Sequence, residues 1–429
     1  MDRSTLAAVC ALAAALAADA AAQSPPGRAA AATDTAAVAA AGSGSATAAS
    51  PVAATSPASA TATTPTAATK SSASPAVAPP PPATPTLLTE VQANAFVSFG
   101  YTYNFNRPPD RLNGLRLFDE NANTFDIDVA ELVLQKPVAK AGETGFRVDL
   151  VAGGAIPQKT QSYGLSIGQS ADLQQAFVSY VAPVGGGRGL RLDFGKFVTH
   201  AGYEVIEGYD GYDDNYSRSL LFNYAIPLTH TGVKATYAAS GAVSAMVMVV
   251  NGWDNVRDNN SGKTVGAQLA LTPAPAVSLV LNYIGGPEKT DTNGFVRNTF
   301  DVVATWKVLG ALTLGFNGVY GVEDGASLAR PGADAVWKGV AGYARYAPAG
   351  NFALALRGET FRDEGGTRLG TGVPTTAGEG TLTPTYKLTD RFLVRGDLRV
   401  DAANKAVFQR DGAPRKRQAT FAGNVIFVY

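Results

Sequence analysis

Apolar and polar side chains alternate along residues 87–429, so that each segment has one apolar and one polar face. Phe392 and Val394, for example, share a face of a segment whose other face carries Arg395 and Asp397. Successive side chains of a β-strand point to opposite faces, so a period of two predicts strands. We predict an all-β fold with about 16 strands. The strands are expected to begin near Asn94, Thr124, Gly145, Asp172, Gly189, His230, Ala242, Lys263, Pro275, Asn298, Ala311, Ala335, Asn351, Thr376, Arg391 and Gln418.

The connections between these segments alternate between short and long. Tight connections such as 239–241 and 389–390 are followed by much longer polar ones. Short turns at one end and longer loops at the other, with an even strand number, are typical of a transmembrane antiparallel β-barrel in a bacterial outer membrane. Such a sheet must close, because an open edge in lipid leaves backbone groups without hydrogen bonds. The long connections are expected at 106–123, 155–170, 199–229, 252–262, 285–297, 323–334, 362–375 and 401–417.

Two of the predicted strands fit this pattern less well. The apolar positions of the second strand change phase between Val129 and Leu132, so we expect a β-bulge near 130–131. In the segment 335–346, Lys338 and Arg345 fall on opposite faces. These segments therefore carry the least certain register.

The first 86 residues differ from the rest of the chain. Residues 1–22 begin with one basic side chain and continue with an apolar stretch and small residues, which is typical of a secretory signal peptide. Residues 23–86 consist mainly of Ala, Pro, Thr and Ser and contain no aromatic residue, so they cannot bury enough apolar surface to fold. We predict a signal peptide at 1–22, a disordered linker at 23–86 and a barrel at 87–429.

Composition excludes several classes of protein. The 35 Lys and Arg residues balance the 35 Asp and Glu residues, so no nucleic-acid partner is expected. Past the predicted signal peptide we find no apolar run long enough for a transmembrane helix. Cys10, in that signal peptide, is the only cysteine, and His200 and His230 are the only histidines. We therefore expect no thiolate or histidine-rich metal site and no cofactor.

The last strand ends in a terminal aromatic residue. Phe421, Val425, Phe427 and Tyr429 share one face, which we expect to contact the lipid bilayer and lipopolysaccharide, with Tyr429 at the membrane interface. The end of this strand also resembles the C-terminal signal that the outer-membrane assembly machinery recognises in bacterial barrels. Phe427 and Tyr429 are therefore the candidate assembly signal, and export through the periplasm is expected.

Three stretches carry a family resemblance: 195–204 (GKFVTHAGYE), 215–219 (NYSRS) leading to 230–234 (HTGVK), and 251–255 (NGWDN) with 285–288 (GGPE). They resemble the β-barrel porin family of OmpL-like outer-membrane proteins, most clearly over residues 96–288. The resemblance implies an outer-membrane channel for small solutes and brings no catalytic residues with it. A homotrimer is one arrangement of such channels, and the sequence leaves the oligomeric state open.

Charged residues on the inner face are the candidate pore-lining groups, because a charge in the barrel must be hydrated or paired. They indicate a water-filled lumen. A barrel plugged by internal ion pairs is the alternative, and charge balance alone does not decide between them. The candidates are Arg147, Asp149, Arg191, Asp193, Arg357, Glu359, Arg395, Asp397 and Arg399, together with Asp301 and Asp401.

The longest connection, 199–229, is the candidate constriction loop. Folded into the lumen, its acidic residues would oppose the wall arginines and select solutes by charge. Left outside, it would be an ordinary solvated loop, and the sequence does not separate the two. Its charged candidates are Glu204, Glu207, Asp210, Asp213, Asp214 and Arg218.

Two other groups of polar residues do not form a recognisable site. Asp254, Asn255, Asp258, Asn259 and Asn260 carry oxygen ligands for calcium, but their spacing matches no fixed calcium loop. The two histidines flank the long loop, but no serine is tied to either by spacing, so a hydrolase is not expected.

Together these features predict a porin for passive diffusion of small hydrophilic solutes or ions. The alternative is a plugged structural barrel that is tethered to the cell wall or a periplasmic partner through residues 23–86.

Overall fold

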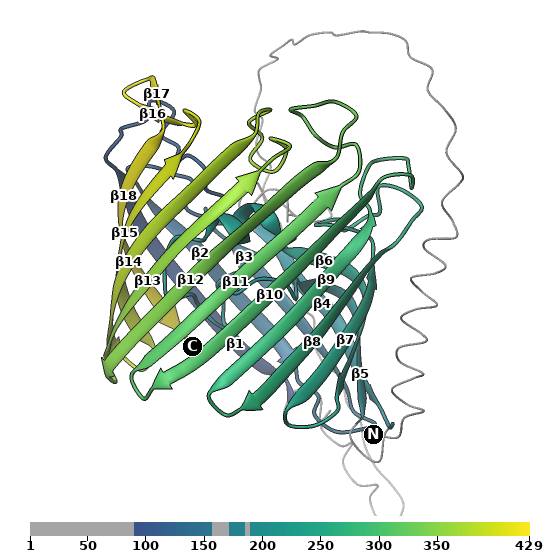
Figure 1. The fold of residues 1–429 in the computed structure, drawn as a ribbon. Helices are drawn as coiled ribbons and strands as arrows, with labels where there is room; N and C mark the ends of the chain where they lie inside the picture. Colours follow the sequence, from purple (N-terminus) through teal and green to yellow (C-terminus); the bar gives the residue numbers. More distant parts are fainter. Residues whose placement is uncertain (1–89, 157–170, 185–188) are drawn as a thin grey trace, which may run out of the picture. The chain divides into compact units, whose positions relative to one another are not determined.

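The computed structural model describes residues 90–156, 171–184 and 189–429, and the predicted signal peptide and linker lie outside these residues. In the described residues, sixteen antiparallel strands close into one barrel (Figure 1). Each strand pairs with its neighbours in sequence, and β1 (Gln92–Asn104) pairs with β18 (Arg417–Val428) to close the ring. The predicted all-β barrel of about 16 strands is therefore confirmed.

The other barrel strands are β2 (Thr124–Lys136), β3 (Thr144–Ala152), β4 (Ala171–Ala182), β5 (Leu190–Val198), β6 (Thr229–Ala238), β7 (Val243–Val250), β8 (Thr264–Ala274), β9 (Val277–Pro287), β10 (Val296–Leu309), β11 (Leu312–Glu323), β12 (Ala335–Ala349), β13 (Phe352–Asp363), β14 (Thr375–Thr389) and β15 (Phe392–Ala403). Every strand begins within two residues of its predicted start. The short turns gather at one end of the barrel and the long connections at the other (Figure 1).

Three local features differ from the sequence pattern or refine it. The last long connection contains a small hairpin, β16 (Phe408–Arg410) and β17 (Ala413–Arg415), which the pattern did not predict. The bulge in β2 lies at Asp128 instead of 130–131, because the pairing with β1 skips this residue. No bulge is needed at Lys338, whose outward side chain pairs with Glu364 near the long-loop end of β12.

The outer face of the barrel is apolar and exposed, as a lipid-facing surface must be. Phe125, Trp306 and Phe421 are among its most exposed side chains, and Phe125 reaches 70% exposure. Asp126, next to Phe125, and Thr420, next to Phe421, belong to the opposite, inward face. Along the described residues, the chain contains no helix that is both long and apolar enough to cross a membrane.

The barrel encloses an apolar cluster that the alternating pattern did not predict. The connection between β5 and β6 contains one turn of π-helix, η2 (Leu221–Ala225), which lies inside the barrel (Figure 1). Leu221 and Phe222 of this turn pack with Trp337 of β12 and Phe361 of β13, and all four are buried. Phe118 from the first long connection joins the same cluster.

Candidate functional site

The connection 199–228, which follows β5, folds into the barrel and reaches its opposite wall. In the ring of strands, β13 and β14 lie half a circumference away from β5 and β6. The loop nevertheless contacts both of these distant strands: Asn215 Nδ2 donates to Thr383 Oγ1 at 2.8 Å, and Leu220 N donates to Glu359 Oε1 at 2.5 Å. The loop therefore divides the lumen instead of extending into solvent.

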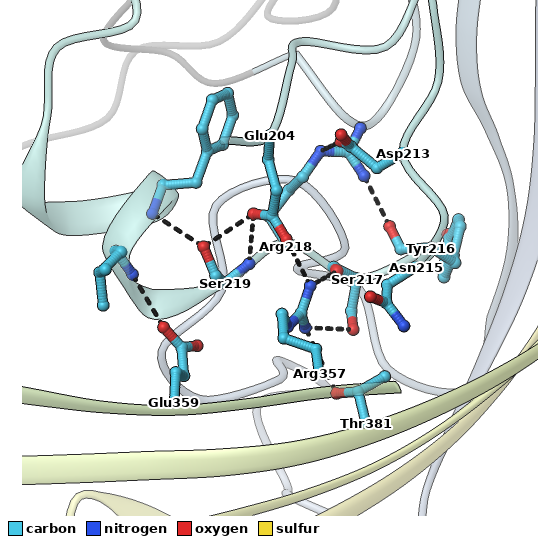
Figure 2. A network of polar contacts seen from close by, with 12 residues as sticks. Glu204, Asp213, Asn215, Tyr216, Ser217, Arg218, Ser219, Arg357, Glu359 and Thr381 are labelled. Carbon is cyan, nitrogen blue, oxygen red and sulfur yellow. Dashed lines mark hydrogen bonds and ion pairs between the residues drawn. The ribbon is translucent and has the colours of Figure 1, made fainter. Parts of the chain in front are cut away.

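Arg357 of β13 is the centre of the main attachment (Figure 2). Its Nη1 lies 2.6 Å from Glu204 Oε1 and also donates to the carbonyl oxygen of Ser217 at 2.6 Å. Glu204 in turn accepts hydrogen bonds from the backbone and hydroxyl of Ser219, both at 2.7 Å. On the wall side, Arg357 Nε donates to Glu379 Oε1 at 2.6 Å. One guanidinium thus joins two segments of the loop to two strands.

Arg395 of β15 makes a second attachment a few residues away along the loop. Its Nη1 contacts Glu207 Oε1 at 2.7 Å and donates to the carbonyl oxygen of Asp213 at 2.6 Å. Arg218, within the loop, lies 3.5 Å from Glu207 and 2.9 Å from Asp213. Buried ion pairs of this kind need such additional hydrogen bonds to offset their desolvation.

Two further wall residues bind the loop backbone. Asp397 of β15 accepts the backbone N–H of Tyr216 at 2.9 Å, and it accepts the hydroxyl of Ser217 at 3.1 Å. Glu359 accepts the backbone N–H groups of Leu220 and Leu221, which are unpaired donors at the start of η2. These carboxylates therefore hold the loop through its peptide groups.

Arg399 of β15 connects this network to the first long connection. Its Nη1 donates to the carbonyl oxygen of Arg218 at 2.5 Å, and its Nη2 lies 2.7 Å from Asp401. Asp401 also pairs at 2.7 Å with Arg116, which is buried in the connection between β1 and β2. Neither Arg116 nor its partner Asp119, 3.0 Å away, was among the candidates predicted from the sequence.

The loop also contacts the wall near its own origin, at β2 and β3. Glu131 Oε2 accepts the backbone N–H of Tyr209 at 2.6 Å. Arg147 lies 2.7 Å from Asp149 on its own strand and 2.7 Å from Asp210 of the loop. On this side the contacts are fewer, and Asp210 keeps 62% of its side chain exposed.

A cavity of about 270 Å³ lies between the loop and strands β2–β5. Its wall side carries Glu131, Arg147, Asp149, Gln174 and Gln175, and its loop side includes the chain around Tyr203 and Asp210. The lining therefore combines these charged and amide side chains with apolar ones such as Val198, Ile206 and Phe222.

Among the other lumen charges, Arg191 and Arg345 lie toward the short-turn end, whereas Asp301 of β10 accepts the backbone N–H of Gly202 in the loop at 2.9 Å. Arg191 Nε contacts Asp193 Oδ1 at 2.8 Å, while 42% of the Arg191 side chain stays exposed. Lys234 lies 3.6 Å from the same Asp193. Arg345 of β12 contacts Asp214 of the loop at 2.9 Å, and both remain partly exposed.

The surroundings shift the pKa values of the loop groups in different directions. Burial alone would raise the pKa of Glu207, but Arg395 and Arg218 outweigh it and the pKa is lowered. Burial raises the pKa of Asp214, against the opposing charge of Arg345. Burial, with His230 nearby, lowers the pKa of His200 to about 3, so this imidazole is neutral at physiological pH.

The arrangement differs from the open gap between loop acids and wall arginines that the sequence suggested. The side chains of Arg357, Arg395 and Arg399 face inward but are 0% exposed, because they touch the loop directly. Glu204 and Glu207 are in contact with these arginines instead of facing them across water. The run 220–228 anchors the loop by apolar packing, which the sequence pattern does not predict because these residues lie within a connection that is mainly polar.

The polar residues at 254–260 and the two histidines have ordinary structural roles. Among the described residues, no cluster of three or more His, Cys, Asp or Glu side chains is arranged to hold a metal ion. Asp254 instead accepts the backbone N–H groups of Leu228 and Thr229. His200 contacts the carbonyl oxygen of Tyr283, and His230 contacts Thr199 and the carbonyl oxygen of Gly252. Within the described part of the chain, neither histidine is hydrogen-bonded to a serine or a carboxylate.

The end of the chain lies at the short-turn end of the barrel (Figure 1). Phe427 and Tyr429 belong to its outer face, with exposures of 40% and 62%. The Tyr429 ring lies beneath the guanidinium of Arg391, 4.9 Å from the ring centroid.

Comparison with known proteins agrees with this architecture. The solved structures similar to this chain include an anion-selective porin from Comamonas acidovorans, with 13% identity, a TM-score of 0.51, and coverage of 79% of this chain and 99% of that one. The outer membrane channel DcaP of Acinetobacter baumannii is 10% identical, with a TM-score of 0.53 and coverage of 79% and 97%. At these identities the likeness concerns the fold alone.

No curated protein sequence matches the chain. A family model does match: "Putative beta-barrel porin-2, OmpL-like" covers residues 90–429, which is all of the barrel. The chain therefore belongs to this OmpL-like family of β-barrel porins and is a channel protein of the outer membrane.

Proposed function

We propose that this porin conducts small hydrophilic solutes by passive diffusion, and that the route passes between the loop 199–228 and strands β2–β5. The observation that carries the proposal is the asymmetric attachment of the loop. Buried ion pairs and apolar packing hold it against β12–β15, whereas a cavity of about 270 Å³ with charged side chains in its lining remains beside β2–β5. Water and solutes need a hydrated path, and this side of the loop offers one.

The candidate pore-lining residues then fall into two groups. Arg147, Asp149, Arg191 and Asp193 lie beside or below the cavity and are proposed to contact passing solutes. Arg357, Glu359, Arg395, Asp397 and Arg399 are bonded to the loop and are proposed to hold it in position. The loop acids Glu204, Glu207 and Asp213 belong to the second group, and Asp210 belongs to the first.

Liposome swelling tests this proposal. The full-length protein is reconstituted, and the vesicles are diluted into isotonic solutions of uncharged sugars of increasing size. Passive diffusion through a narrow path predicts fast swelling with a pentose, slower swelling with a disaccharide, and no saturation as the sugar concentration rises. Vesicles that hold folded barrel but do not swell even with the smallest sugar would contradict the proposal.

The plugged structural barrel remains the second candidate, because the interior contains the ion pairs that it requires. It predicts that vesicles holding folded barrel do not swell even with the smallest sugar. It also predicts that deletion of residues 23–86 releases the protein from the cell-wall fraction, whereas a plain porin would be unaffected.

Two partners are also proposed. The outward aromatic residues Phe427 and Tyr429 support recognition by the outer-membrane assembly machinery after export through the periplasm. The apolar outer face supports contact with lipid and offers surface for association into a homotrimer. Chemical cross-linking in intact outer membranes tests the second point, since a trimer gives a cross-linked band at three times the monomer mass.

A further inference from the structure

We propose that the channel prefers cations over anions, because the cavity between the loop and β2–β5 holds a surplus of carboxylates. This inference rests on the proposed diffusion route and names the class of ion that the route favours. Rings of charged side chains at a narrow point set the selectivity of a pore.

The charges that line the cavity are unequal in number. Among the described residues, its lining includes four carboxylates and one guanidinium: Glu131, Asp149, Glu204, Asp210 and Arg147. Arg147 lies 2.7 Å from both Asp149 and Asp210, so its single charge is shared between two partners. Glu204 pairs with Arg357 of the wall. Without Glu204, three carboxylates in the lining still face one guanidinium, that of Arg147.

Glu131 is the lining carboxylate that is held by a backbone N–H group instead of a cation among the described residues. The residue is only 5% exposed and faces the cavity, yet it forms no ion pair with any described residue. One of its oxygens, Oε2, accepts the backbone N–H of Tyr209, and no described group donates to the other. A carboxylate in the lining of a hydrated passage attracts cations in its ionised form.

A smaller cavity beside the first one adds one more carboxylate, Asp128, because its other two acids pair with arginines: Asp119 with Arg116, and Glu207 with Arg395. It shares Gln174 and Ile206 with the larger cavity. Its charged lining consists of Asp119, Asp128, Glu207 and Arg218. Asp128 accepts hydrogen bonds from the hydroxyl of Tyr216 at 2.8 Å and from Ser98 at 3.1 Å, which are neutral donors. Two carboxylates of β2, three residues apart, thus face the passage without an ion pair to a described residue.

The arginines of the opposite wall do not compensate for these carboxylates. Arg357, Arg395 and Arg399 have no exposed side-chain surface, and each contacts at least one carboxylate within 2.7 Å. A matched pair in contact presents little net charge to a passing ion. Arg191 and Arg345 are partly exposed toward the short-turn end, where Arg345 pairs with Asp214 and Arg191 shares Asp193 with Lys234.

The experiment is a reversal-potential measurement on the full-length protein in planar bilayers under a potassium chloride gradient. We expect a potassium-to-chloride permeability ratio above one. Glu131→Gln and Asp210→Asn should each lower the ratio by about two- to threefold, which is the effect of one unit charge several ångströms from an ion in water. Glu143→Gln, the same change in a short turn outside the lumen, should leave the ratio unaltered.

The outcomes separate the inference from the function on which it depends. A preference for chloride, or a ratio that neither lumen variant changes, overturns the cation preference while the channel proposal stands. A folded barrel that carries no current overturns both. Two lumen variants are used so that a folding defect in one of them does not decide the result.

Discussion

Arg357 and Glu204 join the barrel wall to the loop through a contact of 2.6 Å between Nη1 and Oε1, and their side chains are 0% and 3% exposed. The two residues are 153 positions apart in the sequence. Because Arg357 also holds Glu379, its removal would leave Glu204 without its cation and Glu379 with only Arg399, 3.7 Å away. The position of the loop, and hence the width of the passage, depends on this guanidinium.

We predict that Arg357→Met lowers the free energy of unfolding by about 3–5 kcal/mol, the cost of breaking a buried ion pair on one side. Urea unfolding in lipid vesicles measures this change. Arg362→Met, on the same strand, is the matched control. The Arg362 side chain is 60% exposed, and an exposed pair of this kind is worth about 0–1 kcal/mol. Equal losses in the two variants would show that the contact with Glu204 does not hold the loop.

The contact between Glu207 and the arginines predicts a pH dependence. The pKa of Glu207 is lowered from its ordinary value of 4.5. A carboxyl group with a lowered pKa stabilises the fold above that ordinary value and loses its contribution as the pH falls through the folded-state pKa. The wild type should therefore exceed Glu207→Gln in free energy of unfolding by the same amount from about pH 7 to 5, and by less in stronger acid. A difference that grows as the pH falls would contradict the assignment.

Gly321 of β11 makes room for the indole that supports η2. A Cβ atom at this glycine would clash with Cε2 of Trp337, whose Nε1 donates to the carbonyl oxygen of Ala225 at 3.0 Å. We predict that Gly321→Ala lowers the free energy of unfolding by about 1–3 kcal/mol through overpacking. Gly342→Ala on β12, where a Cβ atom meets no heavy atom within 4 Å, should not destabilise the protein. Thermal unfolding of both variants distinguishes these cases.

His200 should not act as a pH sensor in the channel. Burial lowers its pKa to about 3, so its charge is constant between about pH 5 and 8. We predict that wild type and His200→Asn show the same dependence of conductance on pH in this range. A step near pH 6 that disappears in the variant would show that the imidazole titrates in the lumen.

The terminal aromatic residue should matter for assembly more than for stability. Tyr429→Ala is expected to reduce the amount of heat-modifiable barrel in the outer-membrane fraction, because it removes the aromatic end of the last strand. Tyr346→Ala removes another outward aromatic residue, which is 49% exposed, and serves as the control. If both variants reach the membrane equally well, Tyr429 acts only as a lipid anchor.

The strands could be predicted because their environment is the same along the whole barrel. One face meets lipid and the other meets the lumen, so a period of two persists from β1 to β18. The bulge lies at Asp128, two residues before its predicted position. Asp128 and Val129 are both buried, and alternation alone does not reveal this. Local pattern thus determines the strands but not their irregularities.

The candidate site was only partly predictable, because its contacts join residues that are far apart in the sequence. The acids of the loop and the arginines of the wall were identified, but their direct pairing depends on where the loop folds. The apolar residues Leu220, Leu221 and Phe222 were the available signal that part of this connection is buried. Such a run inside a long polar connection predicts attachment to the barrel interior.

Single-channel recording of the full-length protein in planar bilayers tests the central claim most directly. A loop that is fixed to β12–β15 and leaves a passage beside β2–β5 predicts stepwise, ohmic currents of uniform size. Arg357→Met, by releasing the loop, should make these steps larger or noisier. Barrels that are shown to be folded but give no current steps would contradict the account and favour a plugged structural barrel.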